Sequence, residues 1–242
     1  MTDPLRILYQ DDSLIAIDKP PGLLVHRSPI AKRETQFAVQ QLRDQVGRYV
    51  YPVHRLDRPT SGILLFAFSP DLVSAIGTQW MQKQVQKDYT AIVRGFVSGA
   101  GLIDYTLSFK RDKYADKGKR LDNTPQPACS EYQSIDRFII PQPVGRYDNA
   151  RFSLVQLHPV TGRKHQLRRH MAHIRHPIIG DTTHGDGKQN KFLRQQFGFE
   201  HLALSCTKLS FLHPVTNRII SISCQPHADM VKLLTNWQQF KQ

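Results

Sequence analysis

The chain has 242 residues, of which 40% are hydrophobic and 22% charged, a composition typical of a globular protein. Lys and Arg number 33 against 20 Asp and Glu, which gives a net charge of +13 and a pI of about 9.9. This balance predicts a polyanionic partner, because phosphate contacts dominate the electrostatics of nucleic-acid binding. The sequence has neither an apolar stretch near the roughly 20 residues that span a bilayer nor the apolar core of a signal peptide. We therefore expect a cytoplasmic protein without a membrane partner.

The three cysteines do not predict a disulfide framework or a cysteine zinc site. Cys129, Cys206 and Cys224 are odd in number and widely spaced, and no CxxC pair occurs. We interpret them as free thiols that pack as small apolar groups.

The first elements follow from local patterns. Apolar residues at 7–9 and 14–17 flank the polar segment 10–13 and predict a hairpin. Pro20 and Pro21 lack backbone donors, so the chain must leave the sheet there. A loosely amphipathic helix is expected to end near Gly47. The run Ser69-Pro70-Asp71 predicts the N-terminus of a helix that continues to 81, with Ser69 as N-cap.

The remaining elements are mainly strands. Alternating or apolar runs predict strands at 87–94, 102–109, 129–135, 150–158, 202–211 and 218–224, and an apolar stripe predicts a closing helix at 227–240. The stretches 110–128 and 184–196 are interpreted as exposed basic loops. Many strands, few helices and no regular βαβ alternation favour an α+β fold with a mainly antiparallel sheet. We expect one domain over residues 1–242, since the chain contains no linker long enough to separate two.

A loop rich in charge precedes the apolar strand expected at 63–68. It carries Asp57 between Arg55 and Arg58, and two neighbouring guanidinium groups favour the charged form of a carboxylate. That property suits a nucleophile or a base that must stay ionised at neutral pH. From composition alone, a turn residue in a surface ion pair is the favoured interpretation of Asp57, because Asp is common in loops.

A basic helix is expected after Thr161, which would be its N-cap. Leu167, Met171 and Ile174 share one face, and Pro177 follows the helix. Arg163 and Lys164 would then lie in the first turn, where the helix dipole disfavours cations. This placement predicts a nearby anion, either a protein carboxylate or an RNA phosphate. A solvated basic face is the alternative.

Two further patterns concern aromatic rings. The four histidines of this region (His165, His170, His173 and His176) drift around the helix and have no acidic ligand nearby, so we expect phosphate contacts or surface positions and no metal. Tyr89 lies on the strand at 87–94. It is either a core tyrosine or a ring that stacks on a nucleobase.

In this order along the chain, KPPGLLVH (19–26), HRLDRPTSG (54–62), KDYTAIVRG (87–95), TGRKHQLRRH (161–170) and PIIGD (177–181) resemble the RluA-type pseudouridine synthases. The resemblance covers about residues 7–224 and implies the α+β fold of that family, with a central catalytic cleft. It implies that Asp57 is the catalytic carboxylate, that Arg163 is its ion-pair partner and that Tyr89 stacks on the flipped base. Leu202 and Leu204 would line the pocket. The residues expected to contact RNA are Arg55, Arg58, Lys87, Lys164, His165, Arg168 and Arg169.

The resemblance also implies an isomerase that needs no metal or organic cofactor, and we expect no obligate protein partner and no separate N-terminal RNA-binding domain. The ADKGKR segment (115–120), PQPA (125–128) and HGDGKQN (184–190) are most similar to members that act on uridine 65 of tRNA. Ser205 stands where many members have His, and we expect this to affect packing alone. A synthase for ribosomal RNA and a non-catalytic RNA-binding protein remain alternatives. A retaining glycoside hydrolase is ranked last, since it requires a second carboxylate roughly 5 Å away and no candidate pair is evident.

Overall fold

The structure is a computed structural model that describes residues 3–27, 35–108 and 124–242. These residues form a ten-stranded sheet in the order β1-β2-β4-β9-β5-β8-β7-β6, with β3 paired to β4 and β10 paired to β9. The strands are β1 (Arg6–Gln10), β2 (Leu14–Lys19), β3 (Tyr51–Pro52), β4 (Ser61–Ala67), β5 (Gln86–Arg94), β6 (Ala100–Asp104), β7 (Cys129–Ile140), β8 (Ala150–Pro159), β9 (Leu204–Leu212) and β10 (Ile219–Ser223). The helices are α1 (Ala38–Val46), α2 (Pro70–Met81), α3 (Gln166–His173), α4 (Gly187–Phe197) and α5 (Ala228–Trp237), and a 3₁₀ turn follows at Gln238–Phe240.

All of these strand pairs are antiparallel except β4 with β9, which run parallel at the centre of the sheet. At this junction Gly62 pairs with Cys206 and has a φ of 99°. A Cβ on Gly62 would lie 2.2 Å from the carbonyl oxygen of Cys206, so a side chain cannot be accommodated. The glycine of the TSG segment therefore permits the contact that joins the two halves of the sheet. The expectation of an α+β fold with a mainly antiparallel sheet is confirmed.

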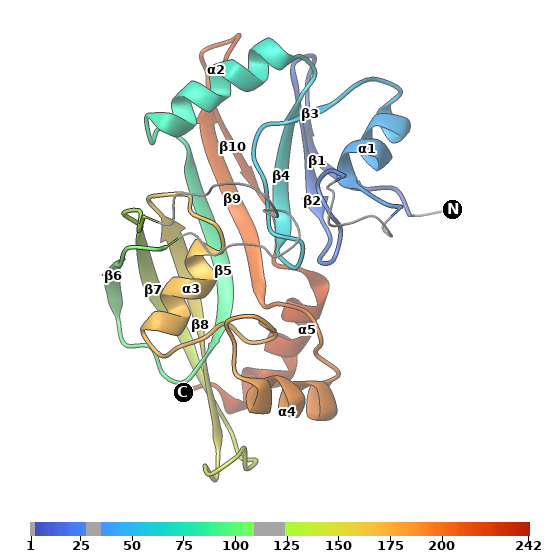
Figure 1. The fold of residues 1–242 in the computed structure, drawn as a ribbon. Helices are drawn as coiled ribbons and strands as arrows, with labels where there is room; N and C mark the ends of the chain where they lie inside the picture. The colour runs from blue at the N-terminus through green and yellow to red at the C-terminus, as the bar shows by residue number, and fades with distance from the viewer. Residues whose placement is uncertain (1–2, 28–34, 109–123) are drawn as a thin grey trace.

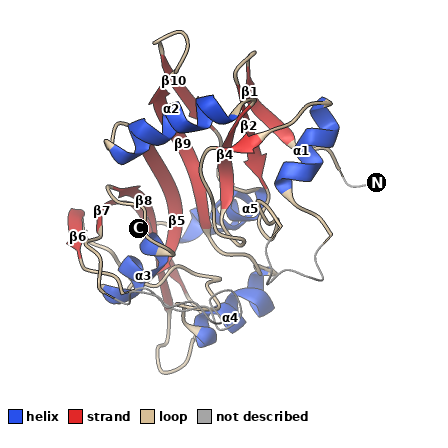
Figure 2. Ribbon diagram, turned by 45° about the horizontal axis from the view of Figure 1, so that its top comes forward, coloured by secondary structure: helices blue, strands red, loops and turns tan. Residues whose placement is uncertain are grey.

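The core lies between the sheet and its helices (Figures 1 and 2). Every residue of β4 is buried, which places this strand inside the molecule on both faces. The α5 residue Trp237 is fully buried, stacks on Phe152 at 4.7 Å and tilts against Phe138 at 5.6 Å between ring centroids. Helix α2 packs across β3, β4 and β9, and α3 packs on β8. The long sheet is thus the platform on which the loops between its strands are fixed.

Local sequence signals place several helix ends correctly. The hydroxyl of Ser69 accepts a hydrogen bond from the Leu72 amide at 3.5 Å, with Pro70 in the first turn of α2. Helix α1 ends at Gly47, whose φ is 70°. No helix in the described ranges is both long and apolar enough to cross a membrane.

Other expectations were wrong in detail. The stretch 184–196, expected as a loop, contains α4, whose N-cap Asp186 accepts hydrogen bonds from the Lys188 and Gln189 amides at 2.9 and 3.3 Å. The strand expected at 102–109 is β6, which ends at Asp104, whereas β7 continues five residues beyond the expected end at 135. Most of the basic loop expected at 110–128 lies outside the described residues.

Candidate active site

The loop between β3 and β4 carries Asp57. It is held in place by hydrogen bonds from the segment that follows β2. The fully buried Lys19 donates from Nζ to the carbonyl oxygens of Pro20 and Leu23 at 2.9 Å each and of Arg58 at 3.1 Å. Burial lowers the pKa of Lys19 to about 7, although the charge of Asp57 opposes this shift. The amine of Lys19 therefore ties the KPPG segment to the backbone beside Asp57.

His54 fixes the start of the same loop. Its ring stacks on Trp80 at 5.0 Å, and its Nε2 accepts a hydrogen bond from the Leu65 amide at 3.1 Å. Burial, together with the nearby charge of Lys87, lowers the pKa of His54 to about 3. The imidazole is therefore neutral at pH 7 and serves as an acceptor that ties the loop to β4.

Asp57 is paired with a buried arginine. Its carboxylate, 28% exposed, lies 3.2 Å from Nη1 of Arg168, whose side chain is 4% exposed. Arg168 also donates from Nε and Nη2 to the two carboxylate oxygens of Asp181 at 2.7 and 2.8 Å. Such a two-pronged pair fixes the plane of the guanidinium. Arg168 is thus held so that one nitrogen remains directed at Asp57.

The electrostatics of this cluster favour its charged forms. Burial disfavours the charge of Arg168, but the hydrogen bonds and charges of Asp181 and Asp57 outweigh it and raise its pKa above the ordinary value. Burial also works against Asp181, yet Arg168 and the amides of His184 and Thr183 lower the pKa of that carboxyl. Arg168 and Asp181 therefore form a charged pair at the start of α3, and Asp57 lies beside another nitrogen of the same guanidinium.

The expected pairing of Asp57 with Arg163 is wrong. Arg163 is exposed, and its Nε donates to the Pro127 carbonyl oxygen at 3.1 Å. The reason lies in the start of the helix, which begins at Gln166 instead of following Thr161, with His165 in the left-handed conformation at φ 54°. Arg163 and Lys164 therefore precede the helix, and Arg168 occupies its first turn.

Thr161 does not cap this helix as expected. Its hydroxyl bonds to Oε1 of Gln166 at 2.6 Å, and the same oxygen accepts the Arg163 amide at 3.0 Å. Gln166 is buried and donates from Nε2 to the Cys129 carbonyl oxygen and to the Ser130 hydroxyl, each at 2.9 Å. The glutamine of TGRKHQLRRH therefore anchors the turn that brings Arg168 to Asp57.

Tyr89 lies on β5 between Leu157 of β8 and Cys206 of β9. Burial raises its pKa well above the ordinary value, and the charges of Cys206 and Asp57 add to this shift. The phenol is therefore neutral, and the nearby carboxylate of Asp57 further disfavours its ionisation. Leu202 and Leu204 are buried near the start of β9. Their role in lining a substrate pocket stays a prediction.

The residues expected to contact RNA differ in their exposure and in the contacts that they make within the protein. Arg55, Arg58 and Lys164 are exposed, although Arg58 also donates from Nε to the Gly22 carbonyl oxygen at 3.0 Å. Arg169 donates to the Ser108 carbonyl oxygen at 2.9 Å. Arg168 is the exception, because its buried guanidinium is engaged by two carboxylates within the protein.

His165 connects the Asp57 loop to the segment after Asp181. Its Nε2 lies 3.9 Å from the Asp57 carboxylate, and its Nδ1 shares a hydrogen bond with Nε2 of His184 at 3.0 Å. Burial lowers the pKa of His165, although the charge of Asp57 opposes the shift. His165 therefore borders the active site, and its contact with RNA stays a prediction.

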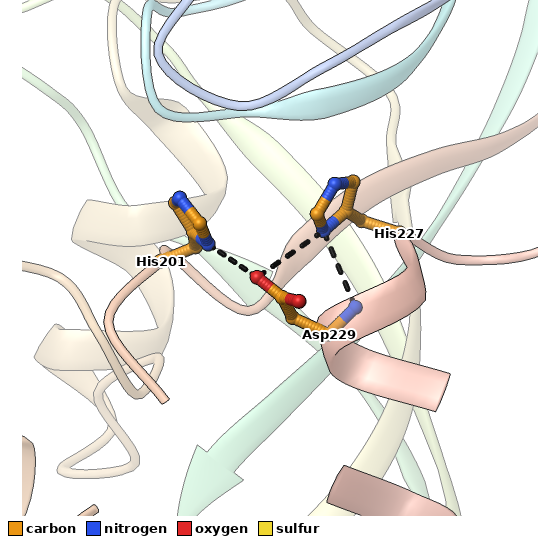
Figure 3. A group of neighbouring side chains, drawn as sticks. All are labelled: His201, His227 and Asp229. Carbon is orange, nitrogen blue, oxygen red and sulfur yellow. Dashed lines mark hydrogen bonds and ion pairs between the residues drawn. The ribbon is translucent and has the colours of Figure 1, made fainter. Parts of the chain in front are cut away.

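The group of residues best suited to a metal ion does not include Asp57. In the described part of the chain, side-chain ligand atoms converge at His201, His227 and Asp229 (Figure 3). His201 and Asp229 lie 2.5 Å apart through Nδ1 and Oδ2, and the Asp229 amide donates to Nδ1 of His227 at 3.4 Å. Two imidazoles and a carboxylate are ligand types that a divalent transition metal accepts. In the present arrangement these contacts cap the start of α5.

Known proteins identify the fold and the family. The structure superimposes on human RNA pseudouridylate synthase domain containing 4 with a TM-score of 0.69 and 26% identity, covering 96% of this chain and 93% of that one. Human RNA pseudouridylate synthase domain containing 1 gives a TM-score of 0.70 over 91% and 83% of the two chains, at 21% identity. The fold is therefore that of a pseudouridylate synthase.

The sequence comparisons specify the family. The family model for RNA pseudouridylate synthase matches residues 13–173. A relative named tRNA pseudouridine synthase C from Yersinia pestis is 51% identical over 221 residues, covering 91% of this chain and 86% of the relative. Another of that name, from Vibrio parahaemolyticus, is 44% identical over 234 residues and covers 97% and 95%. The chain belongs to the RNA pseudouridylate synthase family.

Sequence reasoning missed the roles of three residues that support this site. Asp181 ends the PIIGD segment and Lys19 begins the KPPG segment. Both residues belong to motifs of the family, but the motifs did not predict which groups they contact. Arg168 was assigned to RNA, because the helix start was placed four residues too early. The signal that could have found it was the apolar stripe of α3, which begins only at Leu167.

Proposed function

We propose that this protein isomerises uridine to pseudouridine in tRNA, at position 65, with Asp57 as the catalytic carboxylate. The observation that carries the proposal is the partly exposed Asp57 held 3.2 Å from the buried guanidinium of Arg168. Membership of the family and relatives named tRNA pseudouridine synthase C support the reaction and the substrate. A cytoplasmic location, where tRNA is found, is part of this proposal.

The chemistry requires a carboxylate that remains ionised. The bond between N1 of uracil and C1′ of the ribose breaks, the base rotates, and C5 bonds to C1′. The proton on C5 is released and N1 takes up a proton, so the product is an isomer of the substrate. Asp57 attacks C1′, removes the 2′ proton to give a glycal, or adds to the base. Each of these routes needs the anionic form, which a charge-assisted hydrogen bond from Arg168 favours.

The remaining residues supply access and position. A uridine within a helix must first be flipped out, at a cost of a few kcal/mol. The neutral ring of Tyr89 offers a stacking surface near Asp57. Arg55 is exposed two residues before Asp57 and would hold the opened RNA. Leu202 and Leu204 would supply the apolar wall of the pocket that receives the uracil.

Mapping of the modified nucleotide tests the substrate assignment. Unmodified tRNA and ribosomal RNA transcripts are incubated with the protein, treated with a carbodiimide that marks pseudouridine, and analysed by primer extension. We expect a stop at position 65 of tRNA. A stop in ribosomal RNA alone would keep the reaction and overturn the substrate.

A further inference from the structure

A pocket of about 330 Å³ opens beside the candidate active site. It lies between the end of α2 with the start of β5 on one side and the connection from β8 to α3 on the other. Its wall includes three cationic side chains, Lys83, Lys87 and Arg163, and the residues described there include no Asp or Glu. The pocket is therefore large enough for a ligand and carries one sign of charge.

Lys87 is the unusual member of this wall. Its side chain is nine-tenths buried, with 9% of the residue exposed. Within the described ranges it has no hydrogen-bond acceptor and no carboxylate within ion-pair distance, and its Nζ lies 5.1 Å from the ring centroid of Trp80. Burial lowers its pKa from the ordinary value. The Nζ atom is not among the fully buried side-chain atoms, so the ammonium group reaches the open space of the pocket, where an anionic ligand would offset the cost of its partial desolvation.

The neighbours of Lys87 do not supply that anion. Asp88, next in the chain, forms an ion pair with His158 at 3.0 Å. His54, stacked on Trp80, is neutral because its pKa is lowered to about 3. The ring of Trp80 already contacts His54 and Lys87, so a nucleobase has no clear stacking place there. The pocket is suited to a phosphate group better than to a base.

The pocket adjoins the catalytic residues. Lys87 and Tyr89 lie two residues apart on one face of β5, a separation of roughly 7 Å along a strand. Arg163 lies just before α3, the helix that carries Arg168. Arg163 uses only Nε, for the Pro127 carbonyl oxygen, so its two terminal nitrogens have no protein acceptor in the described part of the chain. A group held in the pocket would therefore lie next to a uridine placed at Tyr89 and Asp57.

We propose that this pocket binds one phosphodiester group of the RNA backbone next to the flipped uridine, with Lys87 as the buried counter-charge and Arg163 and Lys83 as outer contacts. The inference rests on the proposed function, because it takes the ligand to be the RNA substrate. It assigns Lys87 to substrate positioning and explains why this lysine has no anionic partner among the described residues.

Salt dependence of RNA binding tests the contact directly. Lys87→Met removes the charge and keeps the length of the side chain, and Lys232→Met makes the same change on the exposed face of α5. The dissociation constant for an unmodified tRNA transcript is measured from 50 to 300 mM KCl. We expect Lys87→Met to bind roughly tenfold more weakly and to reduce the slope of log K against log salt by about 0.9, the value for one phosphate contact. Lys232→Met should leave the slope unchanged.

The folded state provides a second readout. Since Lys87→Met removes a partly desolvated charge that has no ion-pair partner in the described part of the chain, its thermal midpoint should equal or exceed that of the wild type. A clear loss of stability would assign Lys87 to the core and contradict the proposal. Arg163→Gln, on an exposed residue, should also lower the salt slope, which provides a test independent of Lys87.

Neutral methylphosphonate linkages identify the phosphate. They are placed one at a time around the target uridine, and we expect one position to weaken binding to the wild type and to have no effect on Lys87→Met. Equal sensitivity of both proteins at every position would overturn the proposal. The proposal would also be overturned if 10 mM inorganic phosphate stabilised the protein against thermal unfolding while no methylphosphonate linkage affected RNA binding. That result would indicate a site for a free anion. These binding results do not depend on turnover. If the protein shows them but forms no pseudouridine, the proposed function is refuted, whereas the phosphate-binding site is retained.

Discussion

Replacing Arg168 separates the role of this residue from that of Arg163. In Arg168→Gln, the carboxylate of Asp181, 1% exposed, keeps the amides of Thr183 and His184 as donors but loses its cation. Removing one partner of a buried ion pair costs roughly 3–5 kcal/mol. The two remaining amide donors place the expected loss at the lower end, about 3 kcal/mol in the free energy of unfolding.

The same change should slow catalysis, because Asp57 loses the guanidinium at 3.2 Å. A charge-assisted hydrogen bond contributes about 1.5–3 kcal/mol, which corresponds to roughly a 10- to 100-fold lower kcat. In Arg168→Gln/Asp181→Asn the unpaired buried carboxylate is also removed. We expect this double variant to regain part of the lost stability but none of the lost kcat.

Arg163→Gln is the matched control. Arg163 is exposed and makes one hydrogen bond, to Pro127, so its loss should change stability by less than about 1 kcal/mol and should raise KM more than it lowers kcat. Stability is measured by urea denaturation followed by circular dichroism, and kcat by single-turnover reactions on tRNA. The assignment would be refuted if Arg163→Gln lowered kcat more than Arg168→Gln, or if Arg168→Gln were as stable as the wild type.

Three further predictions concern the scaffold. The pKa of His54, about 3 in the folded protein, lies below the value of about 6.5 expected after unfolding. Below pH 6.5 the unfolded chain therefore binds a proton that the folded protein does not, so stability should fall as the pH drops. In His54→Gln, the slope of unfolding free energy against pH should be shallower by up to about 1.4 kcal/mol per pH unit. Gly62→Ala should lower stability by about 3 kcal/mol or prevent folding, seen as insoluble expression, because its Cβ would overlap the Cys206 backbone. Trp237→Ala should lower the unfolding free energy by roughly 3–5 kcal/mol, measured in urea, since the ring is buried between Phe152 and Phe138.

Local signals in the sequence determined much of the fold. The N-cap at Ser69 and the helix end at the glycine after Val46 depend on residues that are close in the sequence. The structure has both helix ends where they were expected. The parallel junction of β4 with β9 could not be predicted in this way, because Gly62 and Cys206 are far apart in the chain. Only the close backbone approach in space explains that glycine.

The site shows the same division. The motifs identified the segments that meet at Asp57, but not which arginine reaches it. That choice depends on the first residue of α3, which is set by hydrogen bonds of the Gln166 side chain to Thr161, Ser130 and the Cys129 carbonyl oxygen. Ser130 and Cys129 lie in β7, so the sequence around Thr161 alone predicted a helix that starts too early.

Tritium release tests the central claim, that Asp57 performs uridine isomerisation, most directly. Transcripts of tRNA labelled with tritium at C5 of uridine are incubated with the wild type and with Asp57→Asn, which keeps the size of the side chain and removes its charge. The proposed mechanism predicts release of tritium to water by the wild type and none above background by Asp57→Asn, with both proteins folded by circular dichroism. Equal release by the two proteins would contradict the role of Asp57, and no release by the wild type from any RNA would contradict the proposed reaction.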